Sequence, residues 1–164
     1  MIIFVKNKHT LQIDEFKFKC CIGKKGSTNN KKEGDKKTPK GTFEIENLYF
    51  RKDRKKKPST LLKSIEIKKY MGWCNDVRFP KKYNKLCKIG KKIKNEKLKR
   101  KDNKYDFIIP IKYNFQNPIT GLGSCIFIHL TNDYKPTAGC IALREKDFLI
   151  MLKLIKKKTK IKII

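Results

Sequence analysis

A cysteine and a histidine near the C-terminus are the residues best suited to do chemistry in this chain. Cys140 follows His129 by 11 positions, and the loop between them is polar and contains Pro136. A strand end, a loop and a return turn can bring such a pair within hydrogen-bond reach, as a thiol nucleophile with an imidazole base requires. The imidazole would take the thiol proton and leave the thiolate, which is the reactive form.

The turn in front of the cysteine strengthens this interpretation. Gly139 lets the backbone turn sharply, so the N–H groups of Ala138, Gly139 and Cys140 can point into one concavity, as an oxyanion hole needs. Taken singly, a strand histidine and a lone cysteine are more often structural residues than catalysts. The short segment nevertheless supplies a nucleophile, a base and oxyanion donors together.

This segment resembles the active-site signature of the L,D-transpeptidase (YkuD-like) catalytic domain, in which a histidine is followed by Ser/Thr-x-Gly-Cys. Here His129 is followed by Thr137-x-Gly139-Cys140. A separate stretch, Gly34–Phe43, is similar to the G-D-x-x-T-P-x-G-x-F motif of the same family. Three further segments resemble the branch of the family with a Gly-Trp-Cys segment: Met71–Asp76, Tyr113-Asn114 and Gly123–His129. The resemblance therefore runs from Gly34 to Leu143.

The resemblance implies a cysteine-dependent acyl transferase that acts on the stem peptides of peptidoglycan. Cys140 would attack the carbonyl of a diamino-acid residue and release the terminal D-alanine, leaving a thioester. An amine of a neighbouring stem would convert the thioester into a crosslink, whereas water would make the protein an L,D-carboxypeptidase. His129 would act first as base and then as acid. The oxyanion would be held by the backbone N–H groups of Gly139, Cys140 and Ala138.

Four further residues are candidates for supporting or substrate-binding roles: Thr137, Trp73, Asn114 and Ser124. Trp73 and Asn114 also have structural interpretations, as a core or rim anchor and as a strand cap. The chain has Ala138 and Ala142 where many family members have polar side chains. We therefore expect a backbone carbonyl to orient His129. Asp35, Thr38 and Gly41 are expected to shape a turn.

The elements that must position these residues are mainly strands, within one domain over residues 1–164. We expect a β-sandwich-like fold with one or two helices. Strands are predicted at residues 1–5, 16–20, 42–50, 61–71, 106–115, 125–130 and 159–164, and a helix over Glu145–Lys158. Pro110 indicates an edge strand or a bulge. Apolar spacings suggest that Pro80–Lys104 is loosely helical.

The composition adds a strong positive charge. Lys and Arg number 43 against 15 Asp and Glu, which gives a formal charge of +28. Such a balance favours anionic polymers, and a non-catalytic basic module is the competing hypothesis from another class. Only five of the basic residues are Arg, however, so we expect no sequence-specific binding of nucleic acid. An AT-biased genome, which favours Lys, together with solvent-exposed surfaces explains the charge equally well. A third hypothesis is a cysteine hydrolase with another substrate.

The six cysteines form no C-x-x-C pair and complete no zinc-ligand spacing with the two histidines. We therefore expect no metal and no cofactor. The disulfide state and the oligomeric state stay open. No signal peptide is visible and no apolar run reaches the ~18 residues of a membrane span. The sequence alone predicts a cytoplasmic protein, whereas the resemblance implies the periplasm or cell envelope.

Overall fold

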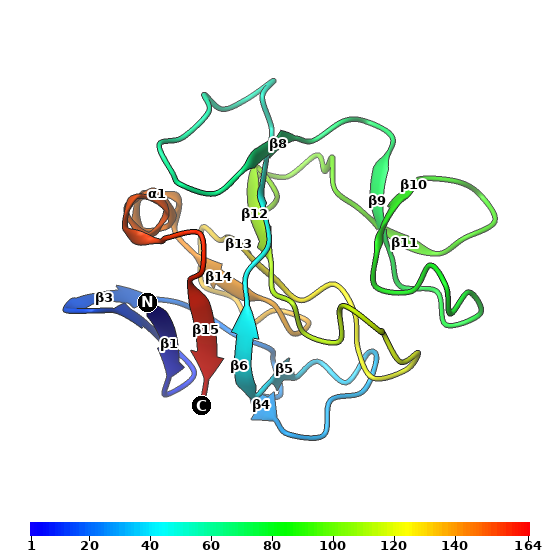
Figure 1. Ribbon diagram of the computed structural model, residues 1–164, viewed down its shortest axis with the longest axis horizontal. Helices are drawn as coiled ribbons and strands as arrows, with labels where there is room; N and C mark the ends of the chain where they lie inside the picture. The colour runs from blue at the N-terminus through cyan, green and yellow to red at the C-terminus, as the bar shows by residue number, and fades with distance from the viewer.

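The computed structural model describes residues 1–164 as a mainly β fold with a single helix (Figure 1). The predicted fold class is thus confirmed, with one helix. Two five-stranded sheets carry most of the chain, together with a three-stranded sheet and a two-stranded ladder. The ladder joins β4 (Ser27–Thr28) to β5 (Thr38–Pro39) in parallel.

The first sheet brings the two ends of the chain together. Its strands, in spatial order, are β3 (Phe16–Lys19), β2 (Thr10–Ile13), β1 (Ile2–Lys6), β15 (Lys160–Ile163) and β6 (Gly41–Glu44). β1 and β15 pair in parallel, and the other neighbours are antiparallel. Ile161 and Ile163 are buried while Lys160 and Lys162 are exposed, which is the period-2 pattern that the sequence shows.

The second sheet carries the candidate site. Its order is β14 (Ile141–Leu143), β13 (Phe127–Leu130), β12 (Phe107–Pro110), β7 (Leu48–Phe50) and β8 (Ser64–Glu66). All four residues of β13 are buried, as expected for a central strand. The edge alternative predicted at Pro110 is wrong, because β12 lies inside the sheet. The bulge alternative fits, because the pairing shifts register by one residue around Pro110, from Ile108 opposite Tyr49 to Ile111 opposite Ile45.

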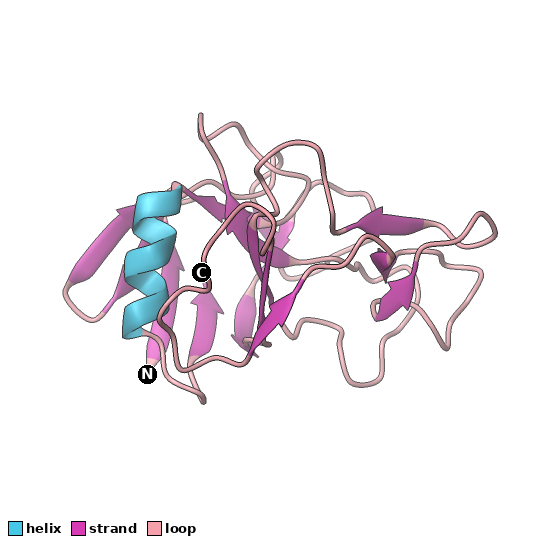
Figure 2. Ribbon diagram, turned by 90° about the horizontal axis from the view of Figure 1, so that it is seen from above, coloured by secondary structure: helices cyan, strands magenta, loops and turns pink.

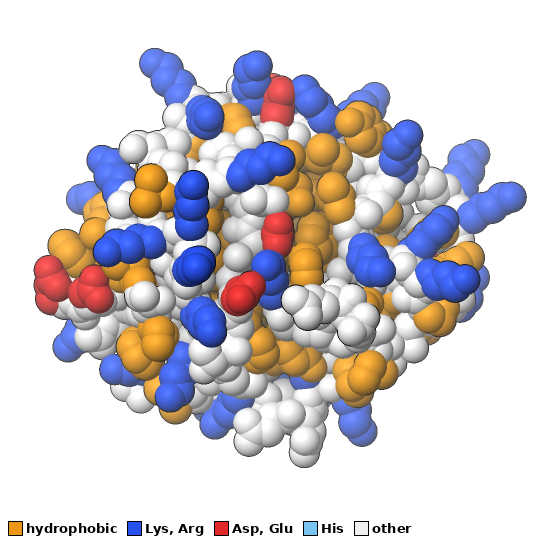
Figure 3. Space-filling view, viewed as in Figure 1, with side chains coloured by type: hydrophobic (Ala, Val, Ile, Leu, Met, Phe, Trp, Pro, Cys, Tyr) orange, Lys and Arg blue, Asp and Glu red, His pale blue; other side chains and the backbone are white.

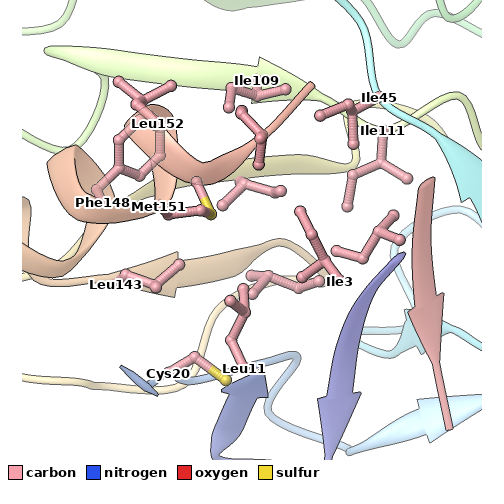
Figure 4. Close-up of a cluster of buried hydrophobic side chains, with 14 of the residues drawn as sticks. Ile3, Leu11, Cys20, Ile45, Ile109, Ile111, Leu143, Phe148, Met151 and Leu152 are labelled. Atoms are coloured by element: carbon pink, nitrogen blue, oxygen red, sulfur yellow. The ribbon is translucent and has the colours of Figure 1, made fainter. Parts of the chain in front are cut away.

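The main core lies between the two five-stranded sheets and the helix α1 (Glu145–Leu154), which stands at one side of the fold (Figure 2). Phe148, Met151 and Leu152 of α1 are fully buried and point into this core (Figure 4). The helix ends four residues before the predicted Lys158. With ten residues, this sole helix is too short to cross a membrane.

The third sheet lies at the far side of the molecule from α1 (Figure 1). It has the order β10 (Leu86–Lys88), β9 (Met71–Cys74) and β11 (Asn95–Lys97). The prediction that Pro80–Lys104 is loosely helical is therefore wrong, since two short strands in this segment pair with β9 instead. The pairing sets Leu86 and Glu96 on either side of Trp73.

The positive charge is distributed rather than concentrated on the face shown in Figure 3. Lys and Arg side chains are spread over that face, with only scattered Asp and Glu between them. The charge therefore marks no single patch on this face.

Candidate active site

The candidate nucleophile and base lie on adjacent strands of the second sheet. β13 and β14 pair in parallel, with Ile128 opposite Ile141 and His129 opposite Ala142. Cys140 immediately precedes β14 and lies beside Phe127, whose backbone N–H donates to Sγ at 3.4 Å. Because strand side chains alternate, positions 127, 129, 140 and 142 share one face of the sheet. Cys140 and His129 are therefore diagonal neighbours on that face.

The Cys140 side chain is a buried, neutral thiol. Sγ donates to the carbonyl of Cys125 at 3.2 Å, and the side chain packs among Trp73, Tyr105 and Phe127. Burial raises the pKa of the thiol to about 12, against an opposing effect of the Phe127 N–H. No hydrogen bond joins the sulfur to His129. The thiolate expected from the sequence is consequently not the resting form.

His129 is a buried, neutral imidazole held in one tautomer. Its Nδ1 lies 2.8 Å from the Leu130 carbonyl, which can only accept, so Nδ1 carries the proton and Nε2 has the free lone pair. Burial lowers the pKa of His129 to about 4, although the bond to Leu130 opposes the shift. The Tyr105 ring contacts the imidazole edge-on, with ring centroids 5.4 Å apart. The expectation that a backbone carbonyl orients His129 is confirmed.

The turn before Cys140 supplies two free backbone donors. Thr137 Oγ1 donates to the Cys140 carbonyl at 2.6 Å and accepts the N–H of Gly139 at 3.1 Å. The N–H of Gly139, which the sequence predicts as an oxyanion donor, is engaged by the Thr137 hydroxyl within the turn. The N–H groups of Ala138 and Cys140 have no acceptor in the protein. Thr137 itself acts by shaping the turn.

Thr38 connects the Gly34–Phe43 motif to this turn. Its hydroxyl donates to the Gly139 carbonyl at 2.8 Å and accepts the N–H of Gly23 at 2.9 Å. Gly139 has φ +145°, and a Cβ there would lie 2.9 Å from the Lys37 carbonyl oxygen. The motif loop thus packs directly behind the nucleophile turn. Asp35 shapes that loop as expected, accepting the N–H groups of Lys32 and Lys37.

A cavity of about 350 Å³ opens on these groups, and it is within the usual size of a small-molecule site. The predicted residues that line it are Cys140, His129, Thr137, Ala138, Gly139 and Ser124. Trp73 does not line it: the indole is 2% exposed and packs in the core, so it offers no face to a substrate. Asn114 does not line it either. Its amide group bonds to Ile119 and Gly123, which organises the loop before β13.

Sequence reasoning missed the residue that ties these segments together. Asn84 is 3% exposed, and its Oδ1 accepts the indole N–H of Trp73 at 3.0 Å and the N–H of Cys125 at 3.1 Å. Its Nδ2 donates to the Tyr113 and Asn114 carbonyls. Cys125, whose carbonyl accepts the Cys140 thiol, has φ +55°, an uncommon value for a residue with a side chain. Nothing local in the Lys-rich sequence around Asn84 indicates this role.

The cavity also has a charged wall that the sequence did not predict. Tyr105 donates to Glu96 at 3.1 Å, and Glu96 pairs with Arg100 at 3.2 Å. No group of three His, Cys, Asp or Glu side chains is arranged to hold a metal ion. All six cysteines are free thiols, and Cys125 is the second thiol in the cavity. The arrangement provides a thiol, an imidazole lone pair and two N–H donors around one hollow, which suits acyl transfer.

Comparison with known proteins gives a family match. The family model of the YkuD L,D-transpeptidase catalytic domain matches residues 1–163. No curated protein matches the sequence.

Two solved structures share the fold. One is the helical cell shape determining protein Pgp2 from Campylobacter jejuni, with 17% identity and a TM-score of 0.54 over 99% of this chain and 46% of that chain. The other is Bd1075 of Bdellovibrio bacteriovorus, with 15% identity and a TM-score of 0.50 over 99% of this chain and 47% of that chain. The chain spans less than half the length of these proteins.

Proposed function

Because the chain belongs to the L,D-transpeptidase catalytic domain family, we propose that it is a cysteine-dependent acyl transferase acting on peptidoglycan stem peptides. The observation that supports this most is the cavity lined by Cys140, by His129 with its free Nε2, and by the unpartnered N–H groups of Ala138 and Cys140. Each of these groups has a part in thioester formation.

The reaction starts from a neutral pair. The thiol leaves the Cys125 carbonyl, and Sγ attacks the carbonyl carbon of the diamino-acid residue while Nε2 of His129 takes the thiol proton. Proton transfer accompanies the attack, because burial disfavours both the free thiolate and the imidazolium beforehand. The carbonyl oxygen becomes an oxyanion that the N–H groups of Ala138 and Cys140 stabilise.

The second half of the reaction releases the leaving group and resolves the thioester. The tetrahedral intermediate expels the terminal D-alanine, whose amine receives the proton from His129. An amine of a neighbouring stem then attacks the thioester while His129 takes the amine proton. The carbon–sulfur bond breaks as the crosslink forms, and His129 returns the proton to the sulfur of Cys140. Water in place of the amine makes the same site an L,D-carboxypeptidase. The ratio of crosslinked to hydrolysed stem, measured with an added amine acceptor, shows which of the two reactions of the thioester dominates.

The cavity contains its own control for this proposal. Cys140→Ala should abolish release of D-alanine from a tetrapeptide stem, whereas Cys125→Ala, which removes the other cavity thiol, should leave most of the activity. Full release by a folded Cys140→Ala variant would refute the assignment of the nucleophile.

The proposed substrate lies outside the cytoplasm, so we place the activity in the periplasm or cell envelope. Fractionation of cells that express the chain tests this location, and recovery in the cytoplasmic fraction alone contradicts it. A basic module that merely binds anionic polymer predicts binding that collapses with salt and is indifferent to Cys140→Ala.

A further inference from the structure

Glu33 differs from the other carboxylates that line the cavity. Glu96 is paired with Arg100 at 3.2 Å, and Asp133 is paired with Lys135 at 3.0 Å. Glu33 forms no ion pair, although the chain has a net charge of +28. A carboxylate left without a cation in so basic a protein is available for a cation from outside.

Neutral donors hold this carboxylate in place. The hydroxyl groups of Tyr83 and Ser124 both donate to Oε2, the latter at 2.7 Å. Tyr83 is completely buried, Ser124 is 7% exposed, and the Glu33 N–H donates to the Gly121 carbonyl at 2.7 Å. These bonds fix the side chain but do not cancel its charge. Oε1 has no donor in the protein, so it is free to accept a hydrogen bond.

The carboxylate is also close to the nucleophile along the cavity wall. Ser124, which bonds to Glu33, directly precedes Cys125, whose carbonyl accepts the Cys140 thiol at 3.2 Å. Lys31, a basic residue that also lines the cavity, does not pair with Glu33, because Nζ of Lys31 is engaged by Asp35 at 2.6 Å and by the Lys32 carbonyl at 2.7 Å. A cationic group on the substrate would therefore meet Glu33 while the reacting carbonyl is at Cys140.

We propose that Glu33 is a specificity-determining residue that binds the side-chain ammonium group of the diamino-acid residue whose carbonyl Cys140 attacks. This inference rests on the proposed function, which requires that residue to lie against the sulfur. An ammonium group that donates to a carboxylate forms a charge-assisted hydrogen bond, which is roughly twice as strong as a neutral one. The site would thus select stems with a free amine over stems in which the amine is blocked.

Binding to a Cys140→Ala protein tests the inference without turnover. Isothermal titration calorimetry would compare three tetrapeptide stems: one with the free side-chain amine, one with the amine acetylated, and one with hydrogen in its place. We expect the free-amine stem to bind at least about tenfold more tightly than both neutral stems. The hydrogen-substituted stem removes the charge without adding bulk, so it separates charge from size.

Substitution of Glu33 then assigns the selectivity. Glu33→Gln keeps an acceptor for Tyr83 and Ser124 but removes the charge, and it should abolish most of the preference while changing binding of the neutral stems less than about twofold. Glu15→Gln is the matched control, since Glu15 is exposed, lies outside the cavity and forms no ion pair. It should leave all three affinities unchanged.

The outcomes separate the inference from the function on which it rests. Equal affinity for the three stems overturns the inference, and this comparison needs no Glu33 variant. A Glu33→Gln variant that weakens all stems by the same factor also overturns it, because that result indicates a structural role. If the preference depends on Glu33 but the unmodified protein releases no D-alanine, the ammonium site stands and the proposed reaction fails.

Discussion

Replacement of Gly139 by alanine should lower both the stability and the activity of the protein, for two structural reasons. The backbone there has φ +145°, a conformation that costs an L-residue about 1–3 kcal/mol. The new Cβ would also lie 2.9 Å from the Lys37 carbonyl oxygen, a backbone atom that cannot rotate away. Overpacking of this kind costs about 1–3 kcal/mol. The lower entropy of the unfolded alanine chain offsets less than about 1 kcal/mol, so a net loss of about 1–6 kcal/mol is expected.

Two other glycines separate the contributions. Gly121 has φ +86° with nothing within 4 Å of the place that a Cβ would take, so Gly121→Ala should show the conformational cost alone, about 1 kcal/mol. Gly90 has open space and no positive φ, so Gly90→Ala should change stability by less than about 1 kcal/mol. Urea denaturation measures the free energy of unfolding of each variant, and D-alanine release measures activity under folded conditions.

Only Gly139→Ala among the three should lose activity while folded, since the clash displaces the turn that carries Cys140. If Gly139→Ala is no less stable than Gly121→Ala, the close approach of Lys37 does not constrain this turn. Full activity in the folded Gly139→Ala variant would contradict the role assigned to the turn.

Three further predictions follow from the same site. The pH dependence of kcat/KM should show a plateau from about pH 5 to above pH 9. The base form of His129 exists above its pKa of about 4, and the thiol form of Cys140 exists below its pKa of about 12. An acidic limb of kcat/KM with its midpoint near pH 6.5 would show that the imidazole pKa is not shifted. Thr38→Val should lower kcat at least about tenfold and the free energy of unfolding by about 1–3 kcal/mol, since it leaves the Gly139 carbonyl and the Gly23 N–H without their partner. Steady-state kinetics and urea denaturation measure the two effects. An unchanged kcat in the folded variant would exclude support of the turn by Thr38. Asn84→Ala should cost about 1–3 kcal/mol in urea denaturation because it strands the buried indole N–H of Trp73, and a loss below about 1 kcal/mol would show that this connection is dispensable.

His129 also links stability to pH. Its pKa is depressed in the folded state, so the unfolded chain binds the extra proton first as the pH falls. The contribution of the neutral imidazole is complete above about pH 6.5 and is lost as the pH falls toward 4. Acid sensitivity in this window should be reduced in a His129→Gln variant, as the urea midpoint at each pH would show.

The parts of the fold that the sequence predicts are those with a local signal. The continuous apolar run of β13 reflects burial on both faces of the strand, and the alternation of β15 reflects burial on one face. Both strands form where expected. The alternating stretch 42–50 is instead two strands, β6 and β7, in different sheets. In β6 half-buried residues alternate with exposed ones, whereas all three residues of β7 are buried, so the residue types alone do not reveal the change of sheet.

The segment Pro80–Lys104 shows where local reasoning fails. Its widely spaced apolar residues fit a helix by number, but β10 and β11 obtain their hydrogen bonds from β9, a strand earlier in the chain. In a Lys-rich stretch, too few apolar positions remain to distinguish the helical period from the strand period. The secondary structure is then determined by the pairing with the distant strand β9.

The candidate site divides in the same way. Cys140 and His129 could be found because their chemistry and spacing are visible in one short segment. Thr38, Asn84 and Glu33 act through contacts between residues 11 to 101 positions apart, and their residue types are ordinary for loops. The sequence also does not show that the Thr137 hydroxyl engages the N–H of Gly139.

The most direct test of the proposed chemistry is to trap the acyl-enzyme. The unmodified protein would be mixed with a tetrapeptide stem, quenched in acid, and analysed by intact mass and peptide mapping. We predict an added mass equal to the stem less its terminal D-alanine, bound to Cys140 and absent from the Cys140→Ala variant. An adduct on Cys125, or turnover of the stem that persists without Cys140, would contradict the central claim that Cys140 is the nucleophile.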